Sequence, residues 1–212
     1  MKKAYIFDFD GTLVDSMSLW SDMVIGYLDE RKIRYPDDLI RIVNTMGAVD
    51  GIHYISKLDE RLDAEEMIKF FGEKTLYQYT SVIQAKNGVS EILHKIKDSG
   101  APIYMLTACN PLLLTPCSKR LGIYDLFDEI FSTDDLLLDK RNPELYDFVL
   151  DKIGKKAEEC LFFDDDINAL RTAKSLGFKV YGVYDDTSKE NESEIRSFAD
   201  GYFYDFNDAD VI

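Results

Sequence analysis

Short apolar runs that alternate with helical patterns are the feature that most restricts how this 212-residue chain can fold. Most of the runs are rich in β-branched or aromatic residues and are too short for helices, which is typical of buried strands. Helical periodicity fills the intervals between the later runs, over residues 89–96, 143–150 and 169–176. Strands that alternate with helices predict an α/β fold, with a Rossmann-like doubly wound parallel sheet and helices on both faces. The runs are AYIFDF near residue 5, PIYMLTA from Pro102, DEIFS from Asp128, CLFFD from Cys160 and KVYGVY from Lys179, with GYFYDF near the C-terminus as a further candidate.

Residues 16–81 interrupt this alternation, because they contain no convincing strand. Apolar residues recur there at helical spacing in two stripes, and core packing is the ordinary role of such stripes. We therefore expect two domains: a Rossmann-like core of residues 1–15 and 82–212, and a small helical cap of residues 16–81 inserted after the first strand. The stripes are Leu19, Trp20, Met23, Val24, Tyr27 and Leu28, and then Met67, Ile68, Phe70 and Phe71.

Composition and charge limit the partners that the chain can bind. The chain is 46% hydrophobic, enough for a packed core, and its formal net charge is −15. An acidic surface repels phosphate backbones, so nucleic-acid binding is not expected. Cys109, Cys117 and Cys160 show no pairing pattern, which suits a reducing compartment. No apolar stretch approaches the roughly 18 residues of a membrane span or forms a signal peptide. We expect a cytoplasmic protein with no membrane partner, and the sequence leaves its oligomeric state open.

Carboxylates end two of the expected strands. Asp8 and Asp10 close the first strand, and Asp164, Asp165 and Asp166 close the fourth. In an open parallel sheet the carboxyl ends of the strands meet at one edge, where ligands bind. Carboxylates held together repel one another unless a cation lies among them, and oxygen ligands select a hard cation such as Mg²⁺. The alternative role of such aspartates is to cap helices or make turns.

Four segments resemble, in order, the motifs of the haloacid dehalogenase superfamily of aspartate-nucleophile phosphatases. DFDGTLVDS is similar to the first motif, DxDGT, and LTAC at the end of the second strand resembles the second. DKRNPELYDF resembles the lysine motif, and LFFDDDINALRTAKSLGFKVYGV resembles the acidic fourth motif with its helix. The resemblance spans nearly the whole chain. The place of the insert is similar to the helical-cap branch, which includes phosphoglycolate phosphatases and β-phosphoglucomutases.

The resemblance implies roles for the carboxylates. Asp8 would be the nucleophile that forms an aspartyl phosphate, and it would also bind the metal. Asp10 would be the general acid–base, while its backbone carbonyl would bind Mg²⁺. Asp165 would be the acidic metal ligand, with Asp164 as its neighbour.

The resemblance also implies a phosphate-binding set. Thr107 and the backbone N–H of Ala108 would hold phosphate oxygens, and Lys140 would neutralise both Asp8 and the phosphoryl group in transfer. The substrate would be a small phosphorylated metabolite.

Three positions depart from the family pattern or complicate it. Arg141 stands where the family usually has proline, so it either loosens the turn that aims the motif lysine or adds positive charge at the rim. Asp166 stands where a small polar residue is common, which leaves open which member of 164–166 binds the metal directly. Cys109 lies beside the phosphate loop, but the sequence shows no partner histidine, so we do not expect it to be the nucleophile.

The sequence thus predicts a magnesium-dependent phosphatase of a small phosphomonoester, such as a sugar phosphate, a phosphoglycolate-like compound or a nucleotide. A β-phosphoglucomutase-like phosphotransferase is the alternative, but its distal phosphate requires cations, and the loop NTMGAVDG has no Lys or Arg. A non-catalytic binding module has no chemical need for the complete motif set. The sequence does not specify the substrate; the cap residues expected to select it are Trp20, Met46, Gly47, Asp50 and His53.

Overall fold

The computed structural model describes residues 2–43, 46 and 48–208. The chain divides into two compact units, one formed by Met1–Met17 with Tyr79–Ile212 and the other by Ser18–Gln78. The chain therefore passes between the units after Met17 and after Gln78, whereas the sequence prediction placed these crossings after residues 15 and 81.

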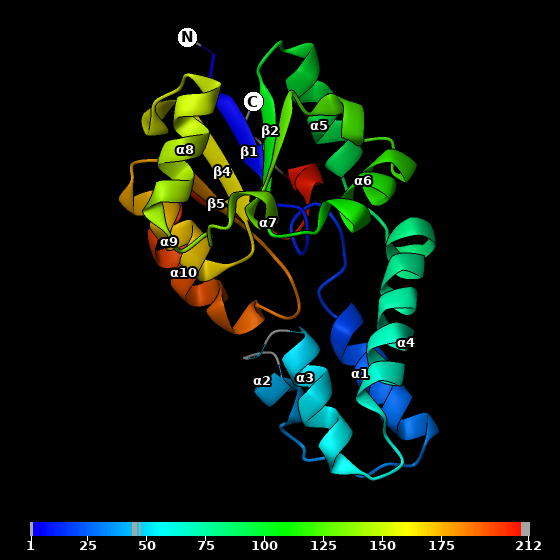
Figure 1. Ribbon diagram of the computed structural model, residues 1–212. Helices are drawn as coiled ribbons and strands as arrows, with labels where there is room; N and C mark the ends of the chain where they lie inside the picture. Colours follow the sequence, from blue (N-terminus) through cyan, green and yellow to red (C-terminus); the bar gives the residue numbers. More distant parts are fainter. Residues whose placement is uncertain (1, 44–45, 47, 209–212) are drawn as a thin grey trace. The chain divides into compact units, whose positions relative to one another are not determined.

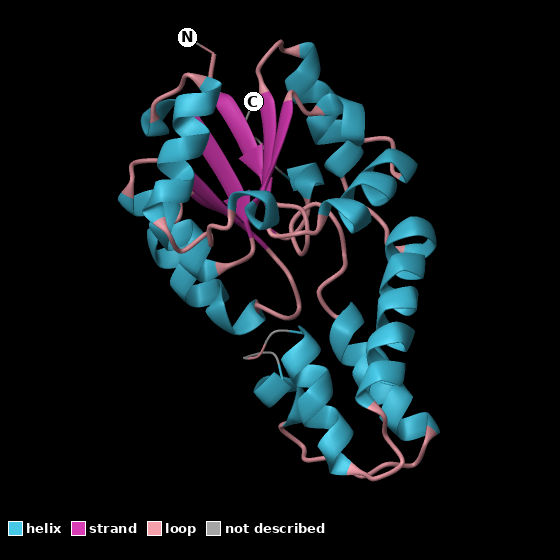
Figure 2. Cartoon of the chain, in the orientation of Figure 1, coloured by secondary structure: helices cyan, strands magenta, loops and turns pink. Residues whose placement is uncertain are grey.

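A six-stranded parallel sheet forms the centre of the first unit (Figure 2). Its spatial order is β3-β2-β1-β4-β5-β6, so the order reverses at β1, which pairs with both β2 and β4. Such a reversal opens a crevice at the carboxyl ends of the strands. This topology confirms the predicted fold class, including the sixth strand. The strands are β1 (Ala4–Phe7), β2 (Ile103–Thr107), β3 (Glu129–Ser132), β4 (Cys160–Asp164), β5 (Lys179–Val183) and β6 (Gly201–Phe203).

Helices cover both faces of this sheet, with α5 and α6 on one face and α8, α9 and α10 on the other (Figure 1). Side chains alternate along each strand, so Ile6 and Phe162 pack on the α8–α9 face, while Phe7 stacks on Phe163 at 4.5 Å between ring centroids. The helices are α5 (Val89–Asp98), α6 (Pro111–Arg120), α7 (Thr133–Leu136), α8 (Pro143–Ile153), α9 (Ile167–Ser175) and α10 (Glu192–Phe198), with 3₁₀ turns at Tyr124–Leu126, Ala157–Glu159, Lys189–Asn191 and Phe206–Asp208.

The second unit is helical over its described residues. Its apolar stripes pack against one another, as the edge-on contact of Trp20 with Phe71 shows, with 5.4 Å between ring centroids. Asp63 begins the longest helix by accepting a hydrogen bond from the Glu66 N–H at 2.9 Å. The helices are α1 (Leu19–Glu30), α2 (Leu39–Val43), α3 (Ala48–Ile55) and α4 (Ala64–Tyr77), with a 3₁₀ turn at Ser56–Leu58. A π-helical turn at Gln78–Val82 follows α4, and all of it after Gln78 belongs to the first unit.

Within the described residues, none of the helices is long and apolar enough to cross a membrane.

Candidate active site

Three buried carboxylates meet where β1 and β4 end. The strands pair in register at Phe7 and Phe163, and the Asp8 N–H donates to the Phe163 carbonyl at 2.9 Å. Asp8 directly follows β1, Asp164 ends β4, and Asp165 is the next residue. Their carboxylate oxygens lie within 4.8 Å of one another. The parallel register therefore brings together two acidic segments that are far apart in the sequence.

Lys140 bridges two members of this cluster. Its Nζ lies 2.5 Å from Asp8 Oδ1 and 2.8 Å from Asp164 Oδ2. The loop that carries it is anchored by the Tyr146 hydroxyl, which donates to the Lys140 carbonyl at 2.9 Å. The lysine thus holds one oxygen of each carboxylate and fixes their separation.

Three ionised carboxylates would give this cluster excess negative charge, so their protonated forms are favoured in the folded protein. Burial raises the pKa of Asp8 to about 7, although the charge of Lys140 opposes this rise. Burial likewise raises the pKa of Asp164, and burial with the charges of Asp164 and Asp8 raises that of Asp165. Burial alone would lower the pKa of Lys140, but the charges of Asp164 and Asp8 outweigh it and raise that pKa. The lysine is therefore charged, and one ammonium cannot balance three ionised carboxylates.

A divalent cation fits this arrangement of donors. Every candidate ligand in the cluster is a carboxylate oxygen, the donor type that Mg²⁺ prefers, and two negative charges remain after Lys140 is counted against the three carboxylates. The Asp10 side chain is not a member of the cluster. Its implied contribution through the backbone carbonyl stays a prediction.

Gly11 lets the Asp165 carboxylate approach the backbone after β1. Its φ is +79°, a left-handed conformation, and a Cβ at this position would lie 2.6 Å from both carboxylate oxygens of Asp165. The next residue, Thr12, donates its hydroxyl to Asp165 Oδ1 at 3.2 Å. The Gly–Thr pair therefore makes room for one metal-ligand candidate and then orients it.

Asp10 has a different environment from Asp8. Its Oδ1 accepts hydrogen bonds from the Ser16 hydroxyl at 2.6 Å and from the Tyr79 hydroxyl at 2.7 Å. Sequence reasoning missed both partners. Ser16 is the last residue of the segment DFDGTLVDS and could have been considered, but Tyr79 lies 69 positions from Asp10, and no local signal connects them.

Thr107 ends β2 at the same edge of the sheet. Its side chain is buried, and its Oγ1 accepts a hydrogen bond from the Cys109 N–H at 3.0 Å. Ala108, between them, is exposed. The loop then enters α6, where the Asn110 side chain accepts from the Leu112 N–H at 2.9 Å. Ala108 is therefore exposed at this tight loop, and phosphate binding by Thr107 and Ala108 stays a prediction.

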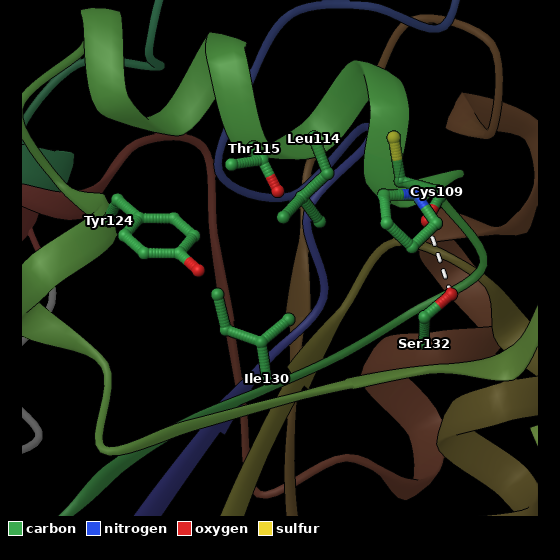
Figure 3. A pocket seen from close by; sticks show the side chains of 7 residues that line it. Cys109, Leu114, Thr115, Tyr124, Ile130 and Ser132 are labelled. Carbon is green, nitrogen blue, oxygen red and sulfur yellow. Dashed lines mark hydrogen bonds between the residues drawn. The ribbon is translucent and has the colours of Figure 1, made fainter. Parts of the chain in front are cut away.

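A pocket of about 150 Å³ lies behind this loop, beside α6 and β3 (Figure 3). The Ser132 hydroxyl donates to the Cys109 carbonyl at 3.4 Å and supports the loop from this side. Burial and the neighbouring Asp10 raise the pKa of the Cys109 thiol, so it stays protonated and is a poor nucleophile. The side chains that line the pocket are those of Cys109, Pro111, Leu114, Thr115, Tyr124, Ile130 and Ser132.

Asp166 is engaged at the start of α9. Its Oδ1 accepts hydrogen bonds from the N–H groups of Asn168 and Ala169, both at 2.8 Å. Its own N–H donates to Asp164 Oδ1 at 2.8 Å. Asp166 therefore caps a helix, and the carboxylate cluster holds Asp164 and Asp165 instead.

Arg141 does not extend toward the cluster as a free charge. Its Nε and Nη2 donate to the two oxygens of Asp139, each at 2.8 Å, and these hydrogen bonds lower the pKa of Asp139 to about 2. The positive charge of Arg141 is thus paired with Asp139 beside the site.

The cap residues expected to select the substrate lie in the second unit. The Trp20 ring packs on Phe71, while Asp50 and His53 are exposed on α3 and Met46 is exposed before it. Gly47 lies outside the described residues, as do residues 44 and 45 of the same loop. Selection of the substrate by these residues stays a prediction.

The fold is an α/β fold whose strand order reverses at β1, and the carboxylate cluster lies at the carboxyl end of that strand. The family model of the haloacid dehalogenase-like hydrolases matches residues 2–177, so the chain belongs to this family. It is 28% identical over 193 residues to the phosphoglycolate phosphatase of Colwellia psychrerythraea, covering 86% of this chain and 84% of that protein. It is 25% identical over 183 residues to the phosphorylated carbohydrates phosphatase of Thermotoga maritima, covering 85% of each.

A solved structure has the same fold. The crystal structure of CbbY from Rhodobacter sphaeroides, in complex with phosphate, superimposes with a TM-score of 0.74 at 19% identity, covering 98% of this chain and 96% of that one. At this identity the likeness concerns the fold alone.

Proposed function

We propose that this protein is a magnesium-dependent phosphatase that hydrolyses a small phosphomonoester through an aspartyl phosphate on Asp8. The observation that carries the proposal is the contact of Lys140 with Asp8 and Asp164 beside Asp165, at the carboxyl edge of the sheet. The family to which the chain belongs, and relatives named as phosphatases of phosphoglycolate and of phosphorylated carbohydrates, support the same reaction.

In the first step, Asp8 attacks the phosphorus and the bond from phosphorus to the leaving oxygen breaks. Asp10 gives its proton to that oxygen, so the alcohol leaves neutral. Lys140 and the loop from Thr107 to Ala108 stabilise the phosphoryl oxygens, because phosphoryl transfer depends mainly on positioning and on neutralisation of charge. Mg²⁺ bound by Asp8, Asp164 or Asp165 would supply further positive charge to the phosphoryl group.

In the second step, Asp10, now a carboxylate, removes a proton from water. The water oxygen attacks phosphorus, the bond to Asp8 breaks, and inorganic phosphate leaves. Asp8 and Asp10 both return to their starting states.

The test is turnover of p-nitrophenyl phosphate and then of a panel of phosphorylated metabolites, with Mg²⁺ and with a chelator. We expect phosphate release that requires a divalent cation and returns when Mg²⁺ is restored. Full activity without any divalent ion would overturn the metal assignment, and no release from any phosphomonoester would overturn the proposed reaction.

A further inference from the structure

Two hydroxyls share one oxygen of the Asp10 carboxylate, and the Cys109 thiol is a third hydrogen-bonding neighbour of this side chain. The hydroxyls of Ser16 and Tyr79 both donate to Oδ1, at 2.6 and 2.7 Å. Ser16 is 6% exposed and Tyr79 is 8% exposed, so little water competes for these hydrogen bonds. Two donors on one oxygen fix the rotation of the carboxylate, because turning it would break both bonds.

The two donors lie on segments that are themselves fixed. The segment that leaves β1 and the segment that returns after α4 run side by side, since the Asp15 N–H donates to the Gln84 carbonyl at 3.1 Å and the Lys86 N–H donates to the Leu13 carbonyl at 2.9 Å. The returning segment is also anchored from α6, where the Arg120 guanidinium donates to the carbonyls of Tyr79, at 3.4 Å, and of Ile83. Neither hydroxyl is therefore a mobile surface group.

We propose that Tyr79 and Ser16 are positioning residues that hold Asp10 by Oδ1, in the orientation in which its carboxyl group exchanges a proton with the leaving alcohol and with water. This inference rests on the proposed function. Both hydroxyls act through Asp10, to whose Oδ1 they donate. Their removal leaves the nucleophile and the carboxylate cluster intact and allows Asp10 to rotate out of alignment.

The experiment uses p-nitrophenyl phosphate, whose good leaving group needs little protonation. A stopped-flow burst of p-nitrophenol reports phosphorylation of Asp8, and the later steady rate reports hydrolysis of the phosphoenzyme, which requires Asp10 as base. In Tyr79→Phe we expect a burst rate close to wild type and phosphoenzyme hydrolysis slowed about 10-fold, a fraction of the effect of general base catalysis. Phosphoenzyme should therefore accumulate.

A double-mutant cycle separates positioning from a general structural role. In the Asp10→Asn background, Tyr79→Phe should change neither rate further, because the carboxylate on which it acts is gone. Ser16→Ala should behave like Tyr79→Phe, and Ser16→Thr, which keeps the hydroxyl, should restore hydrolysis. Ser16 thus provides a second test if Tyr79→Phe does not fold.

Tyr184→Phe is the matched control, since it removes another tyrosine–aspartate hydrogen bond, 2.8 Å to Asp186, away from Asp10. It should leave both rates unchanged. The inference is overturned if Tyr79→Phe and Ser16→Ala leave phosphoenzyme hydrolysis at the wild-type rate, or if they slow it equally in the Asp10→Asn background. If the wild-type protein forms no phosphoenzyme at all, the proposed function fails and the inference fails with it.

Discussion

Asp8 and Asp10 are two residues apart on one loop, yet their surroundings differ in kind. Asp8 lies among charges, with Lys140 at 2.5 Å and two further carboxylates in the same cluster. Asp10 accepts from two neutral hydroxyls and has no cation in the hydrogen bonds that define its position. The charged surroundings suit a nucleophile that must face an anionic phosphoryl group, and neutral donors suit a carboxylate that must both take up and release a proton.

The largest expected effect is that of Asp8→Asn. The amide keeps the shape of the side chain but cannot form the aspartyl phosphate, so turnover should fall by about 10⁴-fold or more, as expected for loss of a nucleophile. Steady-state phosphate release and intact-protein mass spectrometry measure this effect. Near-normal turnover of Asp8→Asn would remove the difference in role between the two aspartates.

Asp10→Asn should have the next largest effect. Loss of general acid–base assistance costs about 10²–10⁴-fold, so turnover should fall within that range. With p-nitrophenyl phosphate, Asp8 should still be phosphorylated, and the intermediate should persist because its hydrolysis lacks a base. Mass spectrometry of the quenched variant should show one phosphoryl group on the peptide that contains Asp8. A label on Asp10 or Cys109 would contradict the mechanism.

Gly11→Ala tests the charged surroundings of Asp8, because it disturbs the carboxylate cluster. The added Cβ would collide with the Asp165 carboxylate, and the φ of +79° at residue 11 disfavours alanine. We expect the Mg²⁺ concentration for half-maximal activity to rise by about 10–100-fold, as for other changes that misplace a metal ligand. Gly26→Ala is the matched control, because a Cβ there meets no neighbour within 4 Å. Equal Mg²⁺ dependence of the two variants would refute the packing argument.

The smallest effect concerns stability and pH. Burial raises the pKa of Asp8 to about 7 and also raises that of Asp165. In the unfolded state these aspartates lose their protons near the ordinary aspartate pKa of about 4, whereas the metal-free folded state still binds protons above that pH. The stability of the metal-free protein should therefore fall as the pH rises from about 4 to about 7.

Mg²⁺ competes with these protons, so it should stabilise the protein more at pH 8 than at pH 5.5. At a concentration of about 100 times its dissociation constant, it should raise the Tm by roughly 5–10 °C at pH 8. Thermal unfolding with Mg²⁺ and with a chelator at both pH values measures the difference. The control is the Asp8→Asn variant without divalent cations. The Tm of this variant should depend less on pH than the Tm of the metal-free wild type. If the rise in Tm caused by Mg²⁺ is no larger at pH 8 than at pH 5.5, the result would argue against a metal at this cluster.

Much of the fold was predictable because its signals are local. Short apolar runs and helical periodicity identified all six strands and the helices α5, α8 and α9, since each depends on residues that are close in sequence. Parallel strands also require that their carboxyl ends meet at one edge. The sequence alone therefore indicated that acidic residues after the first and fourth strands would come together.

The tertiary structure decided which of those acidic residues do what. Asp166 was indistinguishable from its neighbours in the sequence, but helix α9 begins at the next residue, and the Asp166 carboxylate satisfies N–H groups there. The nearness of Gly11 to Asp165 follows from the register of β1 with β4, and the Tyr79–Asp10 hydrogen bond follows from the pairing of the segments that leave and re-enter the core. These contacts join residues far apart along the chain, and their geometry depends on how whole elements pack, which no local pattern of residues encodes.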